Sequence, residues 1–158
     1  MSFESARDEI EEIIKQDNID RSRFGEFSKF KYDEIIKKFY YEFSDYARFA
    51  SSRPELRRKS LHVRDNIDSF VVAGIYQNGN RTDYLESIKS AVPVLNEKLF
   101  LILSNGLVYE GYTDEMFKIL DKSEVWTEDF FILSKKYDWF IAHDYIDWCA
   151  FMYQKRNK

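Results

Sequence analysis

The sequence predicts a single α+β domain, in which N-terminal helices pack on a C-terminal antiparallel sheet of about five strands, ordered β-β-α-β-β-β. Residues 1–92 carry apolar side chains at helical spacing, and residues 97–154 carry short apolar runs separated by polar turns. No segment rich in Pro, Gly or Ser separates the two halves. Because 158 residues suit one domain, we expect residues 1–158 to form one packed unit.

Two helices are expected before residue 51. Ile10, Ile13 and Ile14 repeat at the i, i+3, i+4 spacing and predict a helix over residues 3–16. The polar residues 17–31 are expected to form a loop or a short helical turn. A second helix is predicted over Tyr32–Ala50, whose apolar residues repeat every three or four positions.

Two further helices are expected before the change of period. Pro54 suits the first turn of a helix, and helical spacing continues to Gln77, where Asn78 and Gly79 follow. The run Phe70–Ala73 is the weak point of this predicted helix, because it could instead form a strand. A fourth, short helix is predicted over residues 82–91.

The second half begins with a predicted hairpin. Lys98–Leu103 is an apolar strand, and Asn105-Gly106 is the strongest turn signal in the sequence, expected as a type I′ turn. Leu107–Tyr112 would be the partner strand. Thr113 is then expected to cap a helix that runs to about Lys122.

A three-stranded meander is predicted over Asp129–Gln154. Phe130–Leu133 is an apolar run of strand length, and residues 137–142 alternate with an aromatic enrichment that is typical of strands. Trp148–Tyr153 forms a third apolar run. The two intervening turns are short, so neighbouring strands should be antiparallel.

Composition favours a cytoplasmic protein. The formal net charge is −4, which argues against a generic nucleic-acid coat. The single cysteine, Cys149, lies in an apolar run and is expected to be a buried thiol in a reducing compartment. The N-terminus resembles no signal peptide, and no stretch approaches the ~20 apolar residues of a membrane helix.

The sequence contains no Walker loop, G-x-G-x-x-G, H-E-x-x-H, C-x-x-C or G-x-S-x-G motif, so neither a cofactor nor a metal is expected. One constellation could carry catalysis: His143, Asp144 and Asp147 place an imidazole and two carboxylates within five residues. They could serve a metal- or acid/base-dependent hydrolase. A polar turn, in which aspartates bond backbone amides, explains the same residues more simply.

A basic segment offers a second alternative, nucleic-acid binding. Residues 48–64 hold six lysines and arginines against Glu55, a net charge of +5. Such a segment could equally be a solvated helix face that pairs with acidic segments of the same chain. The basic patch consists of Arg53, Arg57, Arg58, Lys59 and Arg64.

Two acidic segments balance this charge. Residues 1–20 and residues 110–129 each hold seven acidic against two basic residues, a net charge of −5 each. The second segment includes Trp126, which either closes the core or anchors a partner. An aromatic ring flanked by carboxylates suits a basic cleft, because charge speeds encounter and the ring supplies a central anchor. We therefore expect a protein-binding module with another protein as its partner, through Trp126, Glu128, Asp129 and Tyr145.

The last sixty residues resemble small uncharacterised bacterial α+β proteins, some of which resemble immunity proteins of toxin systems. The residues that carry the resemblance are the Asn105-Gly106 hairpin, the helix that follows it, Asp129–Trp139 and the His143-Asp144 turn. The resemblance implies an inhibitor of a bacterial toxin. It is structural and transfers no active-site residue.

Overall fold

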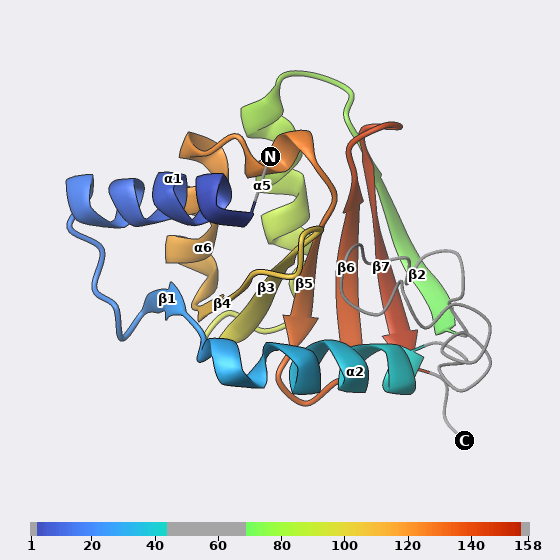
Figure 1. Ribbon diagram of the computed structural model, residues 1–158. Coiled ribbons are helices and arrows are strands. Elements are labelled where there is room, and N and C mark those ends of the chain that lie inside the picture. The colour runs from blue at the N-terminus through green and yellow to red at the C-terminus, as the bar shows by residue number, and fades with distance from the viewer. Residues whose placement is uncertain (1–2, 44–68, 156–158) are drawn as a thin grey trace.

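The computed structural model describes residues 3–43 and 69–155, which form a seven-stranded antiparallel sheet with helices on both of its faces (Figure 1). In chain order the elements are α1 (Phe3–Gln16), β1 (Phe24–Glu26), η1 (Lys29–Lys31), α2 (Tyr32–Phe43), β2 (Ser69–Tyr76), α5 (Arg81–Ala91), β3 (Leu99–Leu103), β4 (Val108–Gly111), α6 (Thr113–Lys122), η3 (Val125–Thr127), β5 (Phe130–Ser134), β6 (Trp139–Asp144) and β7 (Cys149–Lys155).

The α+β class is confirmed, but the expected sheet of about five strands is too small. The strand order is β1-β4-β3-β5-β6-β7-β2. The five predicted strands form the centre, and two strands from the first half of the chain occupy the edges. None of the helices in the described ranges is both long and apolar enough to cross a membrane.

Strand β1 lies in the segment that was predicted to be a loop. It has three residues and pairs with β4 from Phe24↔Gly111 to Glu26↔Tyr109. A Cβ on Gly111 would lie 2.5 Å from the carbonyl oxygen of Arg23, so only a glycine lets the two strands approach. The Phe24 and Tyr109 rings then stack with centroids 5.2 Å apart. A three-residue strand is too short to show a period in the sequence.

Strand β2 corrects the predicted helix over residues 54–77. Ser69–Tyr76 pairs with β7, and a bulge separates Val71 from Ala73. Phe70, Val71 and Gly74 fit helical spacing by coincidence, while the β-branched residues favour a strand. The rest of that predicted helix, and residues 44–50 of the one before it, lie outside the described residues.

The other helices agree with the prediction. α1 and α5 match within one residue at each end, and the described part of α2 begins at Tyr32. Asn80 caps α5, its side-chain oxygen accepting from the amide of Asp83 at 2.9 Å. At α6 the predicted cap is wrong by one residue, because Tyr112 is the N-cap and Thr113 is the first helical residue.

The β3–β4 hairpin is confirmed, but its turn is not type I′. That turn requires a positive φ at both central residues, and here only Gly106, with φ 91°, is positive. The amide of Gly106 donates to the carbonyl of Leu103 at 2.9 Å, and the amide of Leu103 donates to that of Leu107 at 3.0 Å. The loop therefore has three residues, with glycine at the left-handed position.

Alternation along β6 divides the core into two layers. Phe140 faces α2, where its ring lies 4.9 Å from that of Phe39 and 4.8 Å from that of Phe43. His143 faces the opposite side, against Tyr84 of α5. Figure 1 shows α2 crossing the lower ends of β5, β6 and β7. Helices thus pack on the sheet, as predicted, and they cover both of its faces.

Candidate protein-binding site

The end of the sheet at which β5 begins and β6 ends brings two polar segments together. β5 and β6 pair Phe130 with His143, so the residues that precede β5 lie beside those that follow β6. The Asp129 side chain accepts a hydrogen bond from the backbone amide of Tyr145 at 3.1 Å. We call this surface the acidic rim; it consists of Glu124, Glu128, Asp129, Tyr145, Ile146 and Asp147.

The β6–β7 turn presents two apolar side chains to solvent. Asp144 is buried, and its carboxylate accepts from the amide of Ile146 at 3.0 Å, a local bond that shapes the turn. Trp148 closes the turn with a positive φ of 48°. In this turn Tyr145 is 42% exposed and Ile146 is 72% exposed. Exposed aromatic and aliphatic side chains on a fixed turn suit a protein contact.

The segment before β5 is also fixed. The hydroxyl of Thr127 donates to the carbonyl of Glu124 at 2.6 Å within the short helix η3. The amide of Ser104 in the β3–β4 hairpin donates to the carbonyl of Asp129 at 3.2 Å. The backbone of Trp126 lies in η3, but its side chain lies outside what the structure describes, so both interpretations of this ring stay predictions.

Several acidic residues of the segment 110–129 form ion pairs with other elements. Glu124, Glu128 and Asp129 of the same segment belong to the acidic rim, where the Glu128 carboxylate accepts from the Ser104 hydroxyl at 3.4 Å. The hydrogen bond from Lys89 holds the pKa of Asp114 below its usual value. The pairs are Lys135–Glu110 at 2.5 Å, Arg23–Glu115 at 2.6 Å, Lys89–Asp114 at 3.0 Å and Arg81–Asp121 at 3.8 Å.

The two acidic segments that the sequence indicated are neighbours in space. α1 lies against α6, and the carboxylate of Glu9 accepts from the backbone amide of Glu124. Lys122, the last residue of α6, also pairs with Asp17, the residue that follows α1, at 2.5 Å. The Glu9 carboxylate of α1 therefore adds negative charge beside Glu124 of the rim.

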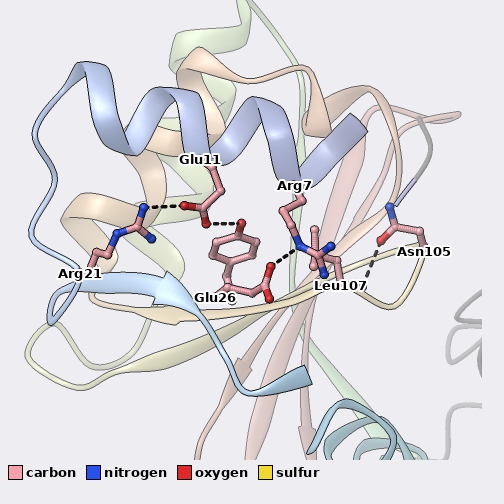
Figure 2. Close-up of polar contacts among 7 residues, drawn as sticks. Arg7, Glu11, Arg21, Glu26, Asn105 and Leu107 are labelled. Atoms are coloured by element: carbon pink, nitrogen blue, oxygen red, sulfur yellow. Dashed lines mark hydrogen bonds and ion pairs between the residues drawn. The ribbon is translucent and has the colours of Figure 1, made fainter. Parts of the chain in front are cut away.

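A second polar cluster joins α1 to the sheet and was not predicted. Figure 2 shows Arg7 of α1 pointing to Glu26 of β1 and Arg21 pointing to Glu11; the Nε–Oε1 distance of the first pair is 2.5 Å. The Tyr109 hydroxyl donates to Glu11 at 2.9 Å. The bond to Glu26 raises the pKa of Arg7. The partners are far apart in sequence, so no motif marked them.

This cluster lies beside a groove of about 500 Å³ between α1 and the chain after β1. Phe30 at its border is 91% exposed. Arg7 and Glu26, two charged side chains of the groove, pair with each other, which fixes β1 beneath α1. We therefore assign the cluster a structural role.

The three residues considered for a hydrolase do not converge. His143 and Asp144 are consecutive in β6, so their side chains point to opposite faces of the sheet. Both are buried, whereas Asp147 lies exposed in the turn. Within residues 3–43 and 69–155 no group of three or more His, Cys, Asp or Glu side chains could hold a metal ion.

Two other predicted features have different outcomes. Cys149 is buried, as predicted. The basic patch, from Arg53 to Arg64, lies outside the described residues, so nucleic-acid binding through it stays a prediction.

Residues 2–158 match DUF6756, a family of unknown function. No curated protein and no solved structure matches the chain.

Proposed function

The chain belongs to this family of unknown function, and we propose that it is a non-enzymatic protein-binding module whose acidic rim engages a positively charged surface of its partner. The observation that carries the proposal is the meeting of the rim carboxylates with the exposed side chains of Tyr145 and Ile146. The two components have separate tasks, since charge speeds encounter and an aromatic anchor slows dissociation.

The support of the rim favours recognition by a preformed surface. Its two segments are held by the Asp129–Tyr145 hydrogen bond and by the bond from Ser104 to the carbonyl of Asp129. A surface that is already ordered loses little conformational entropy when it binds. Such a surface suits an inhibitor that covers a basic cleft. The resemblance of the C-terminal part to immunity proteins gives the finer form of the proposal, a partner that is a bacterial toxin.

Charge reversal tests the electrostatic half of the proposal. Glu124→Lys with Asp147→Lys changes two exposed side chains of the rim and should slow association with the partner by about tenfold or more at low salt. The measurement is the association rate, by surface plasmon resonance, with the partner captured from the cells that make this protein. The rate of the native chain should also fall as salt rises.

A matched variant controls for net charge. Glu34→Lys with Glu86→Lys alters exposed residues of α2 and α5 by the same amount, away from the rim, and should leave most of the association rate in place. Tyr145→Ala should instead raise the dissociation rate. Equal losses in the rim variant and in the control variant would contradict a role for the rim.

A further inference from the structure

Phe30 is the most exposed large apolar side chain among the residues that the structure describes. It lies in η1, is 91% exposed, and borders the groove between α1 and the chain after β1. Figure 1 shows β1 between α1 and the start of α2, at one edge of the sheet. A phenyl ring in water leaves a large apolar area uncovered, which is unfavourable. A molecule that covers this ring therefore gains from its burial.

The backbone on both sides of Phe30 is held in place. The amide of Phe27 donates to the carbonyl of Val108 in β4 at 3.0 Å, which ties the chain before η1 to the sheet. The amide of Lys31 donates to the carbonyl of Ser28 at 2.9 Å, and η1 continues directly into α2. The ring is thus presented on a preformed support, which reduces the conformational entropy lost on binding.

The groove beside this ring has room for an aromatic side chain. Its volume of about 500 Å³ lies in the range of sites that enclose small ligands. The lining is mainly apolar and includes Phe27. Arg7 and Glu26, which also line the groove, pair with each other. An apolar side chain can therefore enter without separating these two charges.

The two walls of the groove carry opposite charges. On α1, Glu4, Asp8 and Glu11 share one helix face, and Glu11 lines the groove. Glu4 and Asp8 are exposed. On the other wall, η1 holds Lys29 and Lys31 on either side of the exposed ring; both are exposed, and η1 contains no acidic residue. An occupant that carried only one sign of charge would be repelled by one of the walls.

A second copy of the chain meets these requirements. In a twofold dimer the same surface of each chain meets that of the other, so every contact occurs twice. When the ring of Phe30 enters the groove of the second chain, Lys29 and Lys31 approach Glu4 and Asp8 of that chain. The basic wall of each copy then faces the acidic wall of the other.

We propose that the chain forms a twofold dimer in which Phe30 of each copy occupies the groove of the other. One ring and a few exposed ion pairs on each side make a small contact, so we expect a dissociation constant of about 0.1 mM. The chain is then monomeric at the micromolar concentrations at which unfolding is followed. The dimer goes beyond the proposed function and does not depend on it.

Sedimentation equilibrium of the full-length chain, from about 10 µM to about 1 mM, tests the dimer. The average mass should rise from 19.1 kDa toward twice that value. Phe30→Ala should raise the dissociation constant by about tenfold or more, because the ring is the central anchor. Tyr41→Ala is the matched control: it removes an aromatic ring that is 66% exposed on α2 and should leave the dissociation constant unchanged.

A charge exchange identifies the occupant as a second copy. Lys29→Glu with Lys31→Glu makes both walls acidic, and Glu4→Lys with Asp8→Lys makes both walls basic. Each double variant alone should form less dimer than the native chain. An equal mixture should restore it, because the acidic η1 of one variant meets the basic α1 of the other, and the native pairing remains at the second contact.

Three results would overturn the dimer. The first is a native chain that stays monomeric up to about 1 mM, which would leave the groove to a different ligand. The second is a dimer that persists unchanged in Phe30→Ala. The third is a mixture of the two folded charge variants that forms no more dimer than either variant alone. All of these measurements use the chain without a partner, so failure here is distinct from failure of the proposed binding function.

Discussion

Phe140→Ala is expected to lower the free energy of unfolding by about 3–5 kcal/mol. The Phe140 ring is fully buried and lies at the centre of the layer between the sheet and α2. Besides the α2 rings, it stacks on Tyr153 of β7 with centroids 4.8 Å apart. Truncation leaves a cavity, because the surrounding side chains on the sheet and on α2 are held in place and cannot move in to fill it. Urea unfolding followed by far-UV circular dichroism measures the loss.

Phe30→Ala is the matched control for this substitution. It removes the same side chain from a position that is 91% exposed, so the expected change is within about 0.5 kcal/mol. Similar losses for the two variants would mean that α2 does not cover the sheet as described.

Alkaline pH is expected to remove about 4 kcal/mol of stability between pH 10 and pH 11. Desolvation by burial raises the pKa of Tyr137 to about 12, and it raises the pKa of Tyr32, Tyr84 and Tyr109 further. All four side chains are at most 7% exposed. In the unfolded chain the tyrosine hydroxyls ionise near pH 10, whereas in the native state these four hydroxyls stay protonated to higher pH.

The direction of the change in stability with pH follows from these raised tyrosine pKa values. Stability from the four tyrosines is fully present below pH 10, the unfolded value, and is lost as pH rises toward the folded values. Each tyrosine loses about 1 kcal/mol between pH 10, where the unfolded hydroxyl is half ionised, and pH 11. Urea unfolding at pH 8, 10 and 11 measures the loss. Tyr84→Phe should reduce it by about a quarter, and the exposed Tyr41→Phe should leave it unchanged. Stability that is constant up to pH 11 would contradict the burial of these hydroxyls.

The predictable parts of the fold are those in which the repeat of apolar residues extends over enough positions to distinguish a helix from a strand. The alternation of residues 137–142 specified β6, and Asn105-Gly106 specified the β3–β4 hairpin. β1 has three residues, and its position beside β4 depends on the absence of a side chain at Gly111. The importance of this glycine is visible only once the neighbouring strand is known. The apolar residues of β2 fit both a helical and a strand period, and this segment is a strand because it pairs with β7.

The arrangement of the residues in the proposed acidic rim was predictable only in part, for a similar reason. Glu128, Asp129 and Tyr145 were selected by charge and residue type, and the antiparallel meander places them together. The separation of His143 from Asp144 follows from strand alternation and could have been foreseen. The packing of α1 on α6 could not, because no local pattern reports which helices become neighbours.

Site-specific photo-crosslinking tests the central claim, that the acidic rim is the partner-binding surface, most directly. A photoreactive aromatic amino acid is placed at Tyr145, which is 42% exposed on the rim, or at Tyr41, which is 66% exposed on α2. Both chains are irradiated with the captured partner. The account predicts covalent adducts from position 145 and few from position 41. Adducts from position 41 with none from position 145 would contradict it.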